Sequence, residues 1–155
     1  MAFKKIIIGA DHGAFHLKHH LVQYLKETGM AVSDLGAFDL DPEDDYPDFS
    51  EKVCRAVLED QTAAGVLLCG SGIGTSIAAN KVPGIRCALC TDVTMARLSR
   101  AHNNANVIAF GERLIGTKIA EEMVDIFIET PFDGGRHQRR IDKIAALKRS
   151  FKDNR

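Results

Sequence analysis

The sequence predicts an α/β protein in which helices cover both faces of a five-stranded parallel sheet. Short β-branched or apolar runs alternate with amphipathic stretches from one end of the chain to the other. Several of these runs are continuously apolar, as strands are when both faces of a sheet are covered. The chain of 155 residues is 45% hydrophobic, so we expect a single domain over residues 1–155 with a sizeable core.

The strands and helices are predicted from two kinds of apolar pattern. The strands are short apolar runs: Lys5–Gly9, Ala31–Leu35, Gly65–Cys69, Arg86–Cys90 and Asn106–Phe110. The helices have apolar residues three or four positions apart, a spacing that forms one stripe along a helix. These stripes are Leu17, Leu21, Tyr24 and Leu25; Phe49, Val53 and Val57; Ile73, Ile77 and Ala78; Met95, Leu98 and His102; and Ile115, Ile119, Met123 and Phe127.

A last helix is predicted over about residues 137–150, after the turn-forming stretch "TPFDGGRH". Its apolar stripe is Ile141, Ile144, Leu147 and Phe151. The strand and helix before it already complete the layers of the sheet, so this helix has no obvious place in them. We therefore expect it to pack on a second subunit.

The charge and composition exclude several classes of function. The 20 basic and 21 acidic residues nearly balance, so no overall field favours nucleic acid or an anionic membrane as a partner. The apolar run near the start stops after three isoleucines, far short of a signal sequence or a membrane span. The four cysteines lack the density of a disulfide-stapled secreted domain. We expect a soluble, cytoplasmic protein with reduced thiols.

Polar residues gather where the predicted strands end. In open parallel sheets the ligand lies beyond the carboxyl ends of the strands. Asp11 and His12 follow the first strand, Cys69 and Ser71 the third, and Arg113 the fifth. His102 and Asn103 lie in an asparagine-rich turn, and we expect them at the same edge.

The loop "CGSGIG", residues 69–74, does not have the glycine spacing of a dinucleotide or phosphate loop. Its glycines instead allow backbone N–H groups to turn inward at a helix start, which suits an anion or a developing oxyanion. A tight strand-to-helix turn is the alternative. Beside such donors the Cys69 thiolate is favoured, which suits a general base or nucleophile; a small apolar strand residue is the alternative there.

The remaining histidines, cysteines and arginines predict no metal site and one anion site. His16 and His20 have the spacing of a metal pair but no third ligand nearby, and Cys87 and Cys90 would face opposite sides of a strand. We expect no metal. Arg136 and Arg140 share a helix face and would hold a phosphate dianion together with the helix start; a solvated surface is the alternative.

Five separated motifs together resemble the ribose-5-phosphate isomerase B family, part of a wider group that includes allose- and galactose-6-phosphate isomerases. They are "ADHGAFHLK", "DYPDF", "LLCGSGIGTSIAANKVPGIRCAL", "LSRAHNNANVIAFGERLIG" and "DGGRHQRRIDKI". The resemblance implies a Rossmann-like three-layer sandwich without metal or cofactor, in homodimers that share active sites, or in a dimer of dimers. It also implies interconversion of ribose 5-phosphate and ribulose 5-phosphate through an enediolate.

The resemblance also implies a role for each site residue. Cys69 corresponds to the base that moves a proton between C1 and C2, His102 to the residue that assists ring opening, and Asp11 to a carboxylate at the sugar. Ser71 joins the catalytic set, and the anion hole is formed by Gly70, Gly72, Ile73 and Gly74. Tyr46 and Asn103 contact the substrate, and the phosphate is bound by His12, Arg113, Arg136 and Arg140, with His137 as a neighbour.

Three other functions stay open at this point. The same base and anion hole would serve allose 6-phosphate, galactose 6-phosphate or a tetrose phosphate, and pocket length alone would decide among them. Residues 37–46 border the expected sugar site without revealing its depth. A non-catalytic sugar-phosphate-binding protein would keep the arginines but would not need Cys69 or His102. A dinucleotide-binding module is disfavoured by the glycine spacing.

Overall fold

The predicted parallel sheet is present in the computed structural model, which describes residues 3–150 and, within the last helix, side chains up to residue 147. Its five strands lie in the order β2-β1-β3-β5-β4, and every neighbouring pair is parallel. The predicted strands are all confirmed, with ends shifted by at most two residues. Their bounds are β1 Lys5–Ala10, β2 Ala31–Asp34, β3 Ala63–Cys69, β4 Cys87–Leu89 and β5 Val107–Gly111.

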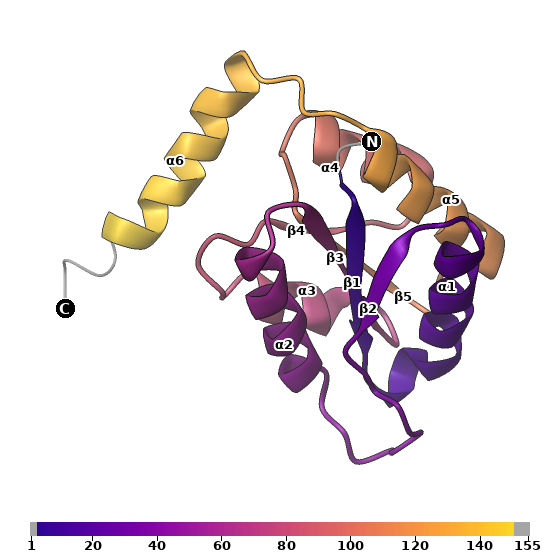
Figure 1. Cartoon of the computed structure of the whole chain (residues 1–155). Coiled ribbons are helices and arrows are strands. Elements are labelled where there is room, and N and C mark those ends of the chain that lie inside the picture. The colour runs from indigo at the N-terminus through magenta and orange to yellow at the C-terminus, as the bar shows by residue number, and fades with distance from the viewer. Residues whose placement is uncertain (1–2, 151–155) are drawn as a thin grey trace.

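Helices cover both faces of this sheet, which confirms the three-layer sandwich (Figure 1). One core layer joins the sheet to α1, α4 and α5, and the other joins it to α2 and α3. The helices are η1 His12–Ala14, α1 Phe15–Glu27, α2 Tyr46–Glu59, α3 Ile73–Ala79, α4 Val93–Ala101, α5 Thr117–Glu129 and α6 Arg136–Ser150.

The central strand β3 shows why the strand patterns are continuously apolar. All seven of its residues are buried. Val66 and Leu68 point into the core beneath α1, α4 and α5, whereas Leu67 points into the core beneath α2 and α3. Each fully buried aliphatic side chain of this kind stabilises the fold by about 1.5–3 kcal/mol. A polar residue at any of these positions would therefore cost stability on one face or the other.

Two of the predicted helix stripes do not face the sheet. The large apolar residues of α3 and α4 are exposed: Ile73 by 51%, Ile77 by 57%, and Met95 and Leu98 each by 41%. Both helices pack on the sheet through small residues instead, including Ala79 and Ala96, which are fully buried. The expectation that these stripes form the buried faces of their helices is wrong for a single chain. Apolar area is left uncovered on both sides of the edge strand β4.

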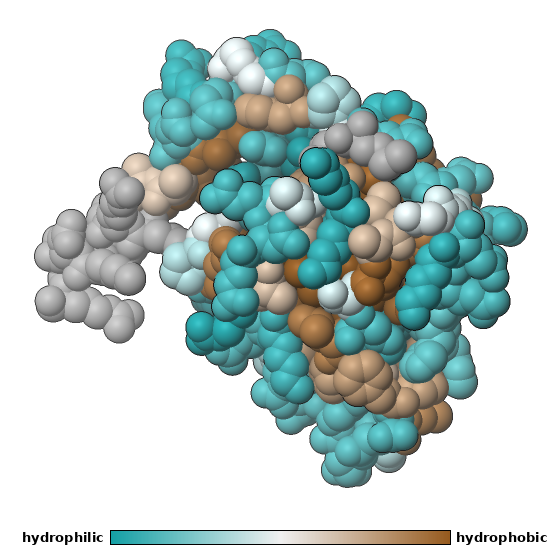
Figure 2. Space-filling model, viewed as in Figure 1, coloured by the Kyte–Doolittle hydropathy of each residue, from teal (hydrophilic) through white to brown (hydrophobic). Residues whose placement is uncertain are grey.

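The last helix, α6, extends away from the sandwich (Figure 1). Ile141 is buried, but Ile144 and Leu147 are at least half exposed, and Phe151 lies outside the described residues. Figure 2 shows hydrophobic side chains where α6 faces the rest of the chain and hydrophilic side chains on its outer side. A groove of about 460 Å³ beside α6 is lined by Asn80, Ile85, Arg86, Cys87, Ala88, Asn103, Ala105 and Ile144. Within residues 3–150, no helix has the length and apolar character needed to span a bilayer.

The strand order places three functional segments side by side. The chain runs from β1 outward to β2 and then returns to β3 on the other side of β1, so the order reverses between β1 and β3. Such a reversal opens a crevice at the carboxyl ends of the strands. By register, Ala10 pairs with Leu68, and Cys69 pairs with Gly111. Asp11, Cys69 and Glu112 therefore leave the sheet together.

Candidate active site

Cys69 ends β3 at this crevice, and its environment differs from that of the other cysteines. The Cys69 thiol is buried, and its Sγ accepts a hydrogen bond from the Gly72 N–H at 3.1 Å. The Cys69 carbonyl accepts the Glu112 N–H at 3.1 Å, which fixes the backbone there. Burial raises the pKa of Cys54 and of Cys90 to about 12, and it raises the pKa of Cys87 as well. Those three thiols stay protonated and pack in the core.

The glycine loop after Cys69 is closely covered by its neighbours. Gly72 has φ +81°, and a Cβ there would lie 2.7 Å from the Phe110 backbone. A Cβ on Gly70 would lie 3.0 Å from Cζ of Arg113, and one on Gly74 would lie 2.4 Å from Cζ of Tyr46. The guanidinium and the phenol ring therefore lie directly on the loop. Gly70 and Gly74 are needed for this close approach and Gly72 for its backbone conformation.

Replacing Gly72 with alanine is expected to lower the free energy of unfolding by about 2 kcal/mol or more, because a left-handed non-glycine residue is strained and this one also meets Phe110. The matched control is Gly116→Ala, since a Cβ at Gly116 has open space around it. Its effect should stay within about 1 kcal/mol. Urea unfolding followed by circular dichroism measures both, and equal stabilities would contradict the assigned strain.

Ser71 and Ile73 complete the loop. The Ile73 N–H donates to the Ser71 Oγ at 3.3 Å, so the serine closes the turn that begins α3. Thr75, one turn along, is buried and shares a 2.7 Å hydrogen bond with Ser50 of α2. These contacts hold the start of α3 against α2, whose first residue is Tyr46. The predicted anion-hole residues are therefore one rigid turn beside the Cys69 sulfur.

Asp11 and His12 leave β1 beside this loop. The Asp11 carboxyl is buried, and its Oδ1 accepts the Gly13 N–H at 2.9 Å. Burial raises the pKa of Asp11, while the hydrogen bond from Gly13 opposes that rise. A Cβ on Gly13 would lie 2.8 Å from the Gly70 nitrogen, so the two turns touch. The Asp11 turn and the Cys69 loop consequently lie side by side at the carboxyl edge of the sheet.

His12 is held by a residue that the sequence did not indicate, Asp44. The Oδ1 of Asp44 lies 2.7 Å from the His12 Nδ1 and also accepts the His12 backbone N–H at 2.9 Å. This side-chain hydrogen bond raises the pKa of His12. In the sequence, Asp44 stands in the acidic run "DLDPEDDYPD", which is typical of solvated surface. Asp44 differs from the other acidic residues of this run only because the folded loop brings its carboxylate against His12.

Glu112, also not predicted, anchors α1 to this edge. One oxygen of its carboxylate accepts the Leu17 N–H in the first turn of α1 at 2.9 Å. Arg113 is the next residue in the chain. It is exposed to solvent, and its guanidinium lies against Gly70. The predicted residues that meet at the carboxyl edge are Asp11, His12, Tyr46, Cys69, Gly70, Ser71, Gly72, Ile73, Gly74 and Arg113.

The remaining predicted residues lie at the opposite edge of the sheet, so the expectation that His102 and Asn103 share the edge of Cys69 is wrong within one chain. Helix α4 runs antiparallel to the strands, and His102 caps its carboxyl end. The Asn103 carbonyl accepts a hydrogen bond at 3.1 Å from Arg86, which directly precedes β4. Arg136, His137 and Arg140 begin α6 at this amino edge as well.

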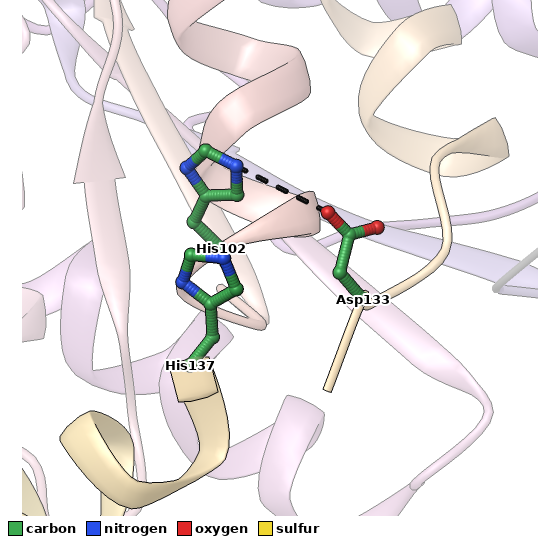
Figure 3. A group of neighbouring side chains, drawn as sticks. All are labelled: His102, Asp133 and His137. Atoms are coloured by element: carbon green, nitrogen blue, oxygen red, sulfur yellow. Dashed lines mark ion pairs between the residues drawn. The ribbon is translucent and has the colours of Figure 1, made fainter. Parts of the chain in front are cut away.

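Three side chains gather at the amino edge (Figure 3). The His102 and His137 rings stack with centroids 4.3 Å apart and planes 7° apart. The His102 Nε2 lies 4.0 Å from Asp133 Oδ2. Burial lowers the pKa of His137, and the neighbouring charges of His102, Arg136 and Arg140 lower it further. Asp133 opposes this shift, and the net result is that His137 is less readily protonated than an ordinary imidazole.

Two side-chain clusters among the described residues have the composition of a metal site: His102, Asp133 and His137, and Asp11, His12 and Asp44. In the first cluster the imidazole planes are nearly parallel, so their in-plane lone pairs do not converge on one point. In the second, the His12 Nδ1 is already hydrogen-bonded to Asp44. The side-chain arrangement in both clusters favours proton and anion chemistry over metal binding.

Comparison with known proteins relates this geometry to one family. The family model described as ribose/galactose isomerase matches residues 6–144. The chain is 44% identical over 144 residues to ribose-5-phosphate isomerase B of Escherichia coli K12, covering 93% of this chain and 96% of the relative. It is 43% identical over 151 residues to ribose-5-phosphate isomerase B of Mycobacterium tuberculosis H37Rv, covering 97% and 93%.

Solved structures of similar proteins have the same fold. Ribose-5-phosphate isomerase B of Clostridium thermocellum aligns with a TM-score of 0.91 at 46% identity, covering 95% of this chain and 99% of that one. The enzyme of Mycoplasma genitalium, solved with bound ribulose 5-phosphate, aligns with a TM-score of 0.90 at 41% identity, covering 96% and 98%.

Proposed function

The chain belongs to the ribose/galactose isomerase family and is an aldose–ketose isomerase, and we propose that it interconverts ribose 5-phosphate and ribulose 5-phosphate with Cys69 as the general base. One observation carries this assignment above all. The Cys69 sulfur is buried at the point where the strand order reverses, with the Gly72 N–H 3.1 Å away and the Asp11 turn beside it. A hydrogen-bond donor on the sulfur stabilises negative charge there, which a base needs.

In the proposed reaction, the Cys69 thiolate removes the proton from C2 of the open-chain sugar. The electron pair of the broken C–H bond forms the C1–C2 double bond of the enediolate, and the negative charge develops on the C1 carbonyl oxygen. The proton on the C2 hydroxyl passes to the C1 oxygen, and Cys69 returns its own proton to C1. N–H donors of the 70–74 loop stabilise the oxyanion, and each such donor is worth about 3–4 kcal/mol.

Ring opening precedes these steps, because the closed sugar hides the carbonyl that makes the C2 proton acidic. We assign it to Asp11 and to His102. Burial raises the pKa of Asp11, and a higher pKa makes this carboxyl group a better proton acceptor for the ring-opening step. His102 lies at the far edge of its own chain. It therefore serves the crevice of a second copy.

A homodimer that shares its sites is supported by charge and by apolar area. Within residues 3–147, neither Arg136 nor Arg140 forms an ion pair with a carboxylate, and both are exposed. The exposed apolar residues of α3 and α4 lie on the two sides of the edge strand β4, and Ile144 of α6 lines a groove together with Cys87 and Ala88 of that strand. Covering them with a second copy would bring its arginines to the phosphate of a sugar held at Cys69, where His12 and Arg113 are already present. Association as a dimer of dimers, a cytoplasmic location and independence from metal and cofactor stay predictions.

A substrate comparison tests the reaction. Purified protein in metal-free buffer is expected to turn over ribose 5-phosphate with a higher kcat/KM than allose 6-phosphate, galactose 6-phosphate or erythrulose 4-phosphate. Ketose formation or loss, followed by coupled assay or NMR, measures each. Higher kcat/KM on a hexose or tetrose phosphate would move the proposal to that substrate within the family. Lack of turnover on all four would leave a sugar-phosphate-binding protein.

A further inference from the structure

His12 and Asp44 form a close side-chain pair at the carboxyl edge, in which one oxygen of Asp44 contacts both the ring and the backbone of His12. The Oδ1 of Asp44 lies 2.7 Å from the imidazole Nδ1 and 2.9 Å from the His12 backbone nitrogen. The Asp44 side chain is 12% exposed and that of His12 34% exposed. A largely buried carboxylate thus fixes both the backbone and the ring of a half-open histidine.

This arrangement dictates which ring atom meets a ligand. Because Nδ1 is occupied by the carboxylate, Nε2 is the nitrogen that remains for a bound group. A carboxylate on Nδ1 also favours the imidazolium form, in which Nε2 carries a proton. An Nε2–H on a cationic ring is a strong donor to a phosphate dianion.

We propose that Asp44 is a positioning residue that orients His12 and keeps it protonated, so that His12 presents an Nε2–H to the phosphate of the substrate. The inference rests on the proposed function, because it takes His12 as a phosphate ligand. Asp44 itself does not touch the phosphate. It acts through the imidazole.

The position of Asp44 in the loop between β2 and α2 suits this role. The Asp44 N–H donates to the Asp41 carbonyl at 3.2 Å, which closes a turn just before α2 begins at Tyr46. The second carboxylate oxygen of Asp44 is buried with no hydrogen-bond partner among the described residues. His12 therefore supplies both of the hydrogen bonds that the Asp44 side chain makes within residues 3–147.

Three charged groups act on His12 or on its neighbour. Asp44 and Asp11 both favour the protonated imidazole, and desolvation opposes them. Arg113 acts to lower the pKa of Asp11 and so favours the ionised form of that carboxyl group. The balance raises the pKa of His12 above its ordinary value of 6.5. The imidazolium form is therefore favoured at and below pH 6.5 and is lost as the pH rises through the raised pKa.

Asp44→Asn tests the proposal because it removes the charge while keeping an oxygen that can accept both N–H groups. At pH 7.5 the KM for ribose 5-phosphate is expected to rise about tenfold, as for one lost charge-assisted hydrogen bond, with kcat changed by less than about threefold. The ratio of variant to wild-type KM should shrink as the pH is lowered from 7.5 to 6, because His12 of the variant becomes more protonated. A purely structural role would raise KM at every pH.

Asp39→Asn is the matched control, since Asp39 is exposed in the same loop and its side chain makes no hydrogen bond or ion pair within residues 3–147. Its KM should equal that of the wild type. Histidine NMR adds a readout that needs no turnover: the His12 titration should move to lower pH in Asp44→Asn, and inorganic phosphate should bind more weakly at pH 7.5. If the wild type lacked isomerase activity but these shifts occurred, the proposed function would fail and this pairing would stand.

Two results would overturn the proposal. One is an unchanged His12 titration in Asp44→Asn. The other is a KM ratio that is the same at pH 6 and pH 7.5. Thermal unfolding of each variant confirms that the folded protein is compared.

Discussion

Replacing Cys69 with alanine is expected to lower kcat for isomerisation by about 10³-fold or more, because the change removes the proposed general base, which carries the proton between C2 and C1 in the proposed reaction. Binding should survive. The 70–74 loop loses the hydrogen bond from Gly72 to the sulfur but keeps its Ser71 turn and its contacts with Tyr46 and Arg113, so the dissociation constant for ribose 5-phosphate should change little. Initial rates measure kcat, and calorimetry with the inactive variant measures the dissociation constant.

Cys54→Ala is the matched control for that substitution. Cys54 is fully buried in α2, and burial holds its thiol protonated with a pKa of about 12. Its loss should cost stability through a small cavity but leave kcat within about threefold of the wild type. Near-normal turnover by Cys69→Ala would remove the cysteine from the mechanism, while loss of both turnover and binding would indicate a damaged crevice instead.

Proton exchange gives a second view of the same step. In heavy water, wild-type turnover should place solvent deuterium on C1 of ribulose 5-phosphate to the extent that the Cys69 thiol exchanges before it returns the proton. The Cys69→Ala variant should label neither carbon. Labelling that persisted in the variant would assign the proton transfer to another group, and Asp11, whose turn touches the 70–74 loop, is one titratable candidate.

The fold and the carboxyl-edge part of the site follow from local patterns. Strands buried on both faces must be apolar throughout, so β1, β3 and β5 are visible as runs of residues such as Ile6, Ile7 and Ile8. Parallel strands bring their carboxyl ends to one edge, and this alone places Asp11 with Cys69. The glycine loop adds the close approach of Tyr46 and Arg113, although the sequence does not specify which side chain covers which glycine.

The positions of the other candidate site residues depend on tertiary and quaternary packing, which no local sequence pattern reveals. The apolar stripe of α4 indicates a buried face, yet Met95 and Leu98 are exposed in the single chain. A stripe has the same spacing whether the sheet or a second subunit covers it. His102 follows that stripe, and the direction of α4 places it at the amino edge despite its asparagine-rich turn. Asp44 differs from its acidic neighbours only in the fold of its loop over His12.

Within one chain, Cys69 and the α6 arginines lie at opposite edges of the sheet. The second large effect that we expect is therefore complementation between two variant chains, one lacking Cys69 and the other lacking the arginines. Arg136→Ala/Arg140→Ala should lower kcat/KM for ribose 5-phosphate by about 10²-fold or more, because the two charge-assisted contacts that we propose with the phosphate are lost. Cys69→Ala is inactive for a different reason. In a two-fold symmetric dimer, a heterodimer of these chains has one site in which Cys69 and both arginines are intact.

Purified heterodimers, isolated with a different affinity tag on each chain, are therefore expected to recover about half of the wild-type kcat/KM per dimer, since one of two symmetric sites is intact. The control places all three substitutions in one chain and pairs it with a wild-type chain; each site then lacks either Cys69 or the arginines, so activity should stay near that of the two variant homodimers. Light scattering at micromolar concentration establishes that each species is at least dimeric. Heterodimers no more active than either variant homodimer would show that each site is built within a single chain, and a monomeric wild type would remove the shared site altogether.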